Sequence, residues 1–226
     1  MSFYDSNNLI KSRKSEETAE NAILWTYELL LLRELKGEDV EEEKGQFLDA
    51  LLEMEIKRGL FHQNPAYSFD GDLQNRLMSH DQLTAITSAS YRYGWRFHEE
   101  VWKEIKRQKL RYDNYRPDNP ERWLHPRDLI YYGILADSKI ARLFVPILAL
   151  ICLISCLSKR RETSGKILAW VRFQTLKKKS LTMRLASKVA DFIIYLIHGS
   201  WADVFSIYFS SEGHLIQEKA KQVYKE

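Results

Sequence analysis

Cysteine, glycine and proline are scarce in this chain, with two, nine and five copies among its 226 residues. Cys152 and Cys156 stand four residues apart in an apolar run, a spacing that puts both on one side of a helix and fits a disulfide poorly. We therefore expect two reduced core thiols and a cytoplasmic protein. The opening stretch MSFYDSNNLIKSRKSEE also lacks the apolar segment of a secretory signal, which favours the same location.

Several well-known catalytic and phosphate-binding motifs are also missing. The sequence contains no G-x-x-x-x-G-K-[ST], G-x-G-x-x-G, H-E-x-x-H, G-x-S-x-G or C-x-x-C. The nine glycines are scattered, so they do not form a loop whose backbone could hold a phosphate. Nucleotide chemistry of the P-loop kind is therefore not expected.

Apolar residues recur at helical spacing along most of the chain, and no period-two strands or internal repeats stand out. The sequence predicts an all-α fold of about eight to ten helices. We expect a compact array of antiparallel hairpins around a buried apolar helix at residues 143–158. One domain over residues 1–226 is predicted, with a possible subdivision at the proline-rich residues 111–126.

Local signals place the ends of several expected helices. They are Ser15 to Gly37, a capping box at Asp39 and Glu42 leading to Gly59, a capping box at Ser79 and Gln82, Pro126 as a first helical position, Ser180 to His198, and a cap at Ser200 and Asp203. After Ser79, the third expected helix carries mostly small residues, so neighbouring helices can approach it closely. We expect it to be a central helix with His80 and Asp81 in its first turn.

The most apolar run is LFVPILALICLISCLS, residues 143–158. As a helix it would be roughly 24 Å long, short of the ~30 Å hydrocarbon core of a bilayer. A helix that is apolar on all sides can be the centre of a globular fold. Alternatively, the run can insert into a membrane or lie at its interface.

Charge is unevenly distributed along the chain. Residues 1–80 hold sixteen acidic and nine basic side chains, net −7, whereas residues 159–190 hold ten basic side chains and one acidic, net +9. These side chains can simply solvate helix faces, or the basic region from Lys159 to Lys188 can bind an anionic membrane surface. Nucleic acid is a less favoured partner. One hypothesis for function is therefore a non-enzymatic membrane-associated or assembly protein that uses residues 143–190.

A second hypothesis comes from a polar cluster around the loop that precedes the third expected helix. Its members are Glu20, His62, Asp70, Asp72, His80 and Asp81. Carboxylates with different pKa values can share acid and base roles, and histidine transfers protons near neutral pH. We assign Asp81 as acid or base, His80 as proton shuttle, and Asp70 or Asp72 to orient water or substrate, with Glu20 as a possible neighbour. The alternative is structural: Asp81 caps its helix, Asp70 and Asp72 form turns, and His80 bonds a backbone group.

The adjacent His80-Asp81 pair in an all-α chain resembles the metal-binding core of HD-type phosphohydrolases. In that family an upstream histidine and a distant aspartate complete the site for one or two divalent metal ions. The resemblance implies His62, His80 and Asp81 as ligands, with Asp113, Asp118 or Asp128 as the distant carboxylate.

Four segments resemble uncharacterised helical proteins of bacteria and their phages: ENAIL (20–24), GLFHQNP (59–65), SHDQLTAI (79–86) and VFSIYFSSEGHLI (204–216). The order of helical hairpins with a polar rim is also similar to that of α/α-toroid carbohydrate-active enzymes. Those hydrolases and lyases use paired acids at inner helix ends. The resemblance implies a hydrolase or lyase acting on a glycan or a related polar small molecule.

Overall fold

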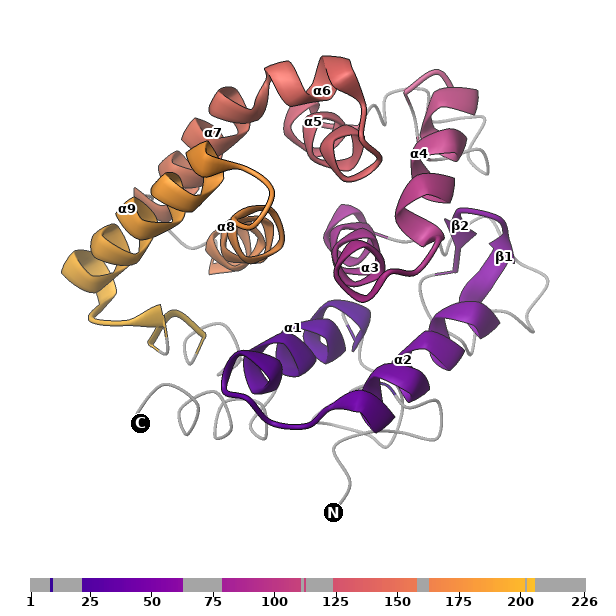
Figure 1. The fold of residues 1–226 in the computed structure, drawn as a ribbon, viewed down its shortest axis with the longest axis horizontal. Coiled ribbons are helices and arrows are strands. Elements are labelled where there is room, and N and C mark those ends of the chain that lie inside the picture. Colours follow the sequence, from indigo (N-terminus) through magenta and orange to yellow (C-terminus); the bar gives the residue numbers. More distant parts are fainter. Residues whose placement is uncertain are drawn as a thin grey trace. The chain divides into compact units, whose positions relative to one another are not determined.

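A computed structural model describes residues 9, 22–62, 79–110, 112, 124–157, 163–201 and 203–205. Their elements, in order, are α1 (Ala22–Leu35), α2 (Glu41–Met54), β1 (Glu55–Lys57), β2 (Leu60–Phe61), α3 (His80–Tyr93), α4 (Phe97–Arg107), α5 (Pro126–Leu135), α6 (Lys139–Leu143), α7 (Val145–Leu157), α8 (Thr163–Leu176) and α9 (Leu181–His198) (Figure 1). The predicted all-α class is confirmed.

Helix ends follow the local signals closely. The Ser79 hydroxyl accepts a hydrogen bond from the Gln82 backbone N–H at the start of α3, and Pro126 is the first residue of α5. Ser180 caps α9 in the same way, and the Ser200 hydroxyl accepts from the Asp203 backbone N–H. These predictions needed only neighbouring residues, since a cap satisfies the unpaired N–H groups of one helical turn.

The predicted second helix is shorter than expected at both ends. Val40, not Asp39, is its N-cap residue, and the helix ends at Met54 instead of running to Gly59. Residues 55–61 form a small antiparallel hairpin of β1 and β2, which the sequence analysis did not predict. Gly59 lies in its turn with φ +78°, and a Cβ there would come within 2.5 Å of the Glu100 backbone. Only glycine fits this close approach to α4.

The chain divides into two compact units. Unit 1 comprises residues 1–27 and 40–142, and unit 2 comprises residues 28–39 and 143–226. The division next to residue 143 differs from the possible subdivision at residues 111–126. A single domain over residues 1–226 stays a prediction.

In unit 1, α3 is the buried helix and packs against α4 and α5. Every residue from Gln82 to Ser90 is buried. Because Thr84 and Ser88 are small, two buried tyrosines of α5 reach their hydroxyls. Tyr132 lies 3.1 Å from Thr84 Oγ1, and Tyr131 lies 2.6 Å from Ser88 Oγ. The small residues of α3 thus make room for tyrosines whose hydroxyl groups are paired inside the core.

In unit 2, α7, α8 and α9 pack against one another, and α7 and α9 lie side by side (Figure 1). The buried helix here is α8, whose residues from Lys166 to Leu176 are all buried. The expectation that residues 143–158 form a buried helix holds for one face only. Cys152 and Cys156 are buried on that face and form no disulfide, as predicted, whereas Ile147, Leu150 and Ile154 are exposed on the other. The apolar sequence alone did not reveal that a neighbouring helix covers only one side.

No helix among the described residues combines the length and the apolar character needed to cross a bilayer.

Candidate functional site

The first candidate site lies in unit 1, where α3 and α5 begin. Asp128, in the first turn of α5, is fully buried, and its Oδ2 lies 3.6 Å from Nδ1 of His80, in the first turn of α3. The Ser79 cap fixes the start of α3, and Pro126 fixes the start of α5. The Tyr132 hydroxyl also donates a hydrogen bond of 3.2 Å to the His80 carbonyl oxygen, which ties the two helices together at this level.

Other polar side chains surround this pair. Arg127 Nε lies 3.4 Å from Asp128 Oδ1, so the buried carboxylate has a cation on one side and an imidazole on the other. The His125 ring lies edge-to-face with the His80 ring, with 6.2 Å between ring centroids. The His80 side chain is about one-third exposed (34%), so solvent reaches a ring whose Nδ1 faces a buried acid.

This arrangement is suited to proton transfer. A carboxylate at Nδ1 favours the imidazole tautomer with a proton on Nδ1 and orients the ring. The opposite ring nitrogen, Nε2, can then accept a proton from a bound molecule and return it. The geometry is therefore compatible with general acid–base chemistry at His80.

The structure does not bring all the predicted site residues together, and some of them lie outside the described residues. Asp81 follows His80 in the same helical turn and is half-buried, while the carboxylate facing His80 Nδ1 belongs to Asp128. His62 lies at the end of the β hairpin, where burial lowers the pKa of its imidazole. Glu20, Asp70 and Asp72 lie outside the described residues, as do Asp113 and Asp118.

Metal binding was proposed for His62, His80 and Asp81, with a distant aspartate. Asp128 is the one of the three distant candidates that the structure describes, and it lies beside His80. Within the described part of the chain, no three His, Cys, Asp or Glu side chains are grouped closely enough to hold a metal ion.

The sequence contains a signal that favours Asp128 over Asp113 and Asp118 as the carboxylate near His80. Leu124, Asp128, Tyr131 and Leu135 recur at helical spacing, and all four are buried. An aspartate on the apolar stripe of a helix needs a partner, because a lone buried carboxylate is costly. That signal distinguishes Asp128 from the acidic residues of the neighbouring proline-rich segment.

The second candidate site is an exposed apolar surface of unit 2, formed by α7, the two residues before it, and α9. We call it the α7–α9 face. Its large apolar side chains are 40–78% exposed: Leu143, Phe144, Ile147, Leu150, Ile154 and Leu157, and on α9 Leu181, Leu185, Val189, Phe192, Tyr195 and Leu196. Single exposed apolar residues are normal, but ten on two adjacent helices, with two more directly before α7, are typical of an interaction surface.

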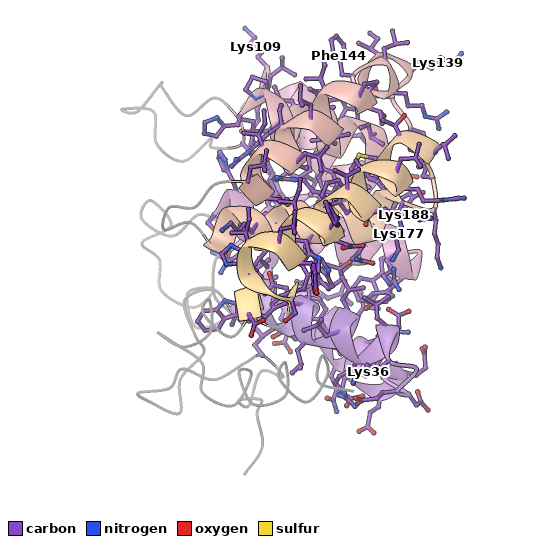
Figure 2. All side chains as sticks on the ribbon, turned by 90° about the vertical axis from the view of Figure 1, so that its left-hand side faces the viewer. Lys36, Lys109, Lys139, Phe144, Lys177 and Lys188 are labelled. Atoms are coloured by element: carbon purple, nitrogen blue, oxygen red, sulfur yellow. The ribbon has the colours of Figure 1, made fainter. Side chains whose placement is uncertain are left out.

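Basic residues accompany this face. Lys177, Lys178 and Lys179 lie in the turn between α8 and α9, and Arg184 and Lys188 follow on α9 itself. Figure 2 views the molecule from the side of α7 and α9, with Phe144 at the top and Lys177 and Lys188 extending at one side. In the described residues 143–157 and 165–198 there are seven basic side chains and one acidic side chain, Asp191, which gives net +6.

Comparisons with protein-family models, with curated proteins and with solved structures give no match, so no family relationship bears on the function.

Proposed function

We propose that this protein associates with the surface of an anionic membrane through the α7–α9 face. One observation carries the proposal: ten large apolar side chains are exposed on two adjacent helices, with two more directly before α7. Covering a fully exposed Leu or Phe side chain gains about 1.5–3 kcal/mol, so each of these partly exposed side chains can contribute on the order of 1 kcal/mol. The sum over one face is sufficient for interfacial binding.

The charge distribution supports anionic lipid as the occupant. Each Lys or Arg near an anionic bilayer contributes about 1 kcal/mol, and five half-buried or exposed basic residues lie from Lys177 to Lys188. A second copy of the chain fits this face less well. A two-fold symmetric contact places identical surfaces together, which would bring Arg184 and Lys188 of both copies into proximity.

The helices are suited to lying in the membrane interface. The thirteen residues of α7 span roughly 20 Å, short of the ~30 Å hydrocarbon core. Arg184, Lys188 and Asp191 interrupt α9, which is otherwise rich in apolar residues. The buried faces of both helices pack within unit 2, so only their outer faces are offered to lipid.

Vesicle flotation tests the proposal. The wild-type chain should float with vesicles of phosphatidylcholine and phosphatidylglycerol and bind vesicles of phosphatidylcholine alone more weakly. Raising the salt from ~0.05 to ~0.5 M should weaken the binding to anionic vesicles, because it screens the basic residues. Leu185→Glu should weaken binding about tenfold or more, since it removes apolar area and adds a negative charge.

The matched control is Leu52→Glu on α2, which makes the same change at a leucine that is similarly exposed (44%, against 55% for Leu185) but lies in unit 1. It should leave vesicle binding unchanged. Equal binding by Leu185→Glu and Leu52→Glu would contradict the proposal. Failure of the wild-type chain to bind vesicles, together with a dimer that Leu185→Glu dissociates in sedimentation experiments, would assign the face to self-association.

A second candidate function is supported by the contact between His80 and Asp128. We propose acid–base chemistry at His80, in a hydrolase or lyase reaction on a glycan or a similar polar substrate. In this proposal His80 transfers the proton, and Asp128 orients its ring. The sequence analysis assigns Asp81 as acid or base, so either Asp81 or Asp128 can be the carboxylate that the reaction requires.

Single substitutions of Asp81 and Asp128 distinguish the roles of these two carboxylates in turnover. Reducing-end release from soluble polysaccharides would be measured for Asp128→Asn, Asp81→Asn and His80→Gln, with thermal unfolding recorded for each. We expect His80→Gln and Asp128→Asn to lose on the order of 10²-fold or more in turnover, and Asp81→Asn to retain it. The reverse pattern, with turnover lost only in Asp81→Asn, would contradict a role for Asp128.

A further inference from the structure

Two basic side chains, Arg184 and Lys188, are exposed on α9 within the α7–α9 face. They stand four residues apart, which makes them neighbours separated by one helical turn. Lys188 points away from the ribbon (Figure 2). Within the described residues, neither side chain forms an ion pair with a carboxylate. Because like charges at this spacing repel each other, an anion held between them would be stabilising.

The turn before α9 orients Arg184. Its Nε donates a hydrogen bond of 3.3 Å to the carbonyl oxygen of Lys177, the first residue after α8. Its two Nη groups make no hydrogen bond within the part of the chain that the structure describes. The end of a guanidinium is a planar fork of N–H groups that matches two oxygens of one anion. Arg184 therefore presents an oriented pair of donors to a ligand outside the chain.

Apolar side chains flank both cations on the same helix. Leu181, Leu185 and Phe192 are 67%, 55% and 61% exposed. At about 100° of rotation per residue, they share with the two cations an arc of about 100° around α9. The charged groups thus lie beside the apolar side chains and not on a separate face of the helix. If the apolar side chains enter the membrane interface, the cations come to the depth at which a lipid phosphate joins its acylated glycerol.

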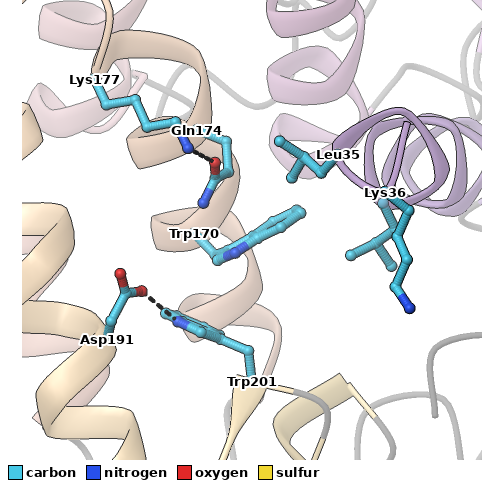
Figure 3. Close-up of a pocket in the computed structure, with 8 residues that line it drawn as sticks. Leu35, Lys36, Trp170, Gln174, Lys177, Asp191 and Trp201 are labelled. Carbon is cyan, nitrogen blue, oxygen red and sulfur yellow. Dashed lines mark hydrogen bonds between the residues drawn. The ribbon is translucent and has the colours of Figure 1, made fainter. Parts of the chain in front are cut away.

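Asp191 is the acidic residue of α9. Its Oδ1 accepts a hydrogen bond of 2.8 Å from the indole N–H of Trp201 (Figure 3). This bond directs the carboxylate toward Trp201, and Asp191 lies about 10 Å along the helix axis from Arg184. The end of α9 that carries Arg184 is therefore electropositive, which favours an anionic ligand there.

We propose that Arg184 and Lys188 bind a phospholipid whose phosphate is an unsubstituted monoester on the glycerol, as in phosphatidate. This inference rests on the proposed membrane association and names the lipid that the same face selects. A monoester phosphate has three terminal oxygens and carries about −1.5 to −2 charge near neutral pH. Two of these oxygens accept hydrogen bonds from the Arg184 fork and the third accepts from Lys188. The phosphodiester of phosphatidylglycerol has only two such oxygens and a single negative charge.

Vesicles of matched surface potential test this selectivity. Phosphatidylcholine vesicles would contain either phosphatidate or phosphatidylglycerol, in amounts that give the same zeta potential at neutral pH. Flotation would measure the binding of the full chain to each, and the equal potential removes the nonspecific effect of charge from the comparison. The chain should bind phosphatidate vesicles about tenfold more tightly, the difference expected for one added charge-assisted hydrogen bond.

Two variants separate the shape of the donor group from its charge. Arg184→Lys keeps the charge and removes the fork, so the ratio of phosphatidate to phosphatidylglycerol binding should fall close to one. Its binding to phosphatidylglycerol should stay within about twofold of wild type, a result that loss of folding would not give. Lys178→Gln is the control, because it removes a whole charge at an exposed residue of the turn before α9. It should change binding to both lipids by the same factor and keep the ratio.

Equal binding of the wild-type chain to the two kinds of vesicle would overturn this inference and leave the proposed membrane association in place. An Arg184→Lys variant that keeps the preference for phosphatidate would also overturn it. So would tighter binding to vesicles of phosphatidylinositol 4-phosphate at the same zeta potential, because that monoester phosphate lies on the inositol ring, away from the glycerol. Failure of the wild-type chain to bind any anionic vesicle would contradict both the inference and the proposed function.

Discussion

Glu104 is a buried carboxylate of unit 1 that contacts several charged and polar side chains. Its carboxylate is 7% exposed and accepts hydrogen bonds from Arg107 at 2.7 and 2.6 Å and from Gln108 at 2.7 Å, while Lys57 Nζ lies 3.3 Å away on the β hairpin. The Arg107 hydrogen bonds, helped by Gln108 and Lys57, lower the pKa of Glu104 to about 2 against the opposing effect of burial. Glu104 thus connects α4 to a hairpin that the sequence analysis did not predict.

We expect Glu104→Gln to reduce the free energy of unfolding at pH 7 by about 3 kcal/mol, because the pKa is lowered by roughly two units. A folded-state pKa below the unfolded value stabilises the protein above pH ~4.5, and this contribution is lost as the pH falls toward 2. Urea unfolding at several pH values would therefore show the variant and the wild type converging at low pH. The exposed Glu99→Gln is the control on the same helix and should change stability by less than ~0.5 kcal/mol. A difference that stays constant down to pH 2 would contradict this interpretation.

Among individual site residues, His80 could be singled out from the sequence, but its partner was less clear. The cap at Ser79 and the helix start at Pro126 are local signals, so the positions of His80 and Asp128 within their own helices were predictable. Their mutual approach depends on the packing of α3 against α5, which places residues 48 apart in sequence next to each other. The sequence indicates this tertiary contact only indirectly, because Asp128 lies among apolar residues at helical spacing.

At the scale of elements, capping explains why helix boundaries were predicted better than helix surroundings. A cap depends on one turn of chain, as at Ser79, Ser180 and Ser200. Which face of a helix is covered depends on distant segments. α7 is almost uniformly apolar in sequence, so nothing local distinguished its buried side from its exposed side. The hairpin after Met54 was missed because two- and three-residue strands are too short to show a period of two.

The Ser180 cap allows a test at this scale. Ser180→Ala should lower the free energy of unfolding by about 1 kcal/mol, because the Met183 N–H then lacks its acceptor at the start of α9. Ser180→Asp should preserve the stability, since a carboxylate is also a good cap and is favoured by the helix dipole. Thermal and urea unfolding would measure both. A loss in Ser180→Asp equal to that in Ser180→Ala would show that the hydroxyl does not act as a cap.

At the scale of the whole molecule, each unit contains a histidine whose burial lowers its pKa. These are His62 in unit 1 and His198 in unit 2, where the neighbouring Lys166 lowers the pKa of His198 further. Lys166 Nζ lies 2.8 Å from His198 Nε2, and burial lowers the pKa of the lysine as well. Both units therefore carry bases that the unfolded chain protonates more readily than the folded one.

Stability should consequently fall as the pH decreases below about 6.5, because protons then bind preferentially to the unfolded state. Each histidine can contribute at most about 1.4 kcal/mol per pH unit to this slope. The double variant His62→Gln with His198→Gln should show a shallower decline between pH 7 and pH 5, and the amide oxygen introduced at position 198 could still accept a hydrogen bond from Lys166. Urea midpoints across this range would measure the slopes. Identical slopes in wild type and variant would assign the acid sensitivity to other groups.

The position of the two cysteines on α7 gives the molecule a built-in reporter. Both thiols lie on the buried face of the helix, and they are the only cysteines in the chain. Burial raises the pKa of Cys156 to about 12. An alkylating reagent needs an accessible thiolate, so its reaction rate measures how often α7 lifts from its neighbours. Because α7 also forms part of the surface proposed to bind lipid, the same reaction rate would report whether vesicle binding makes these openings more or less frequent.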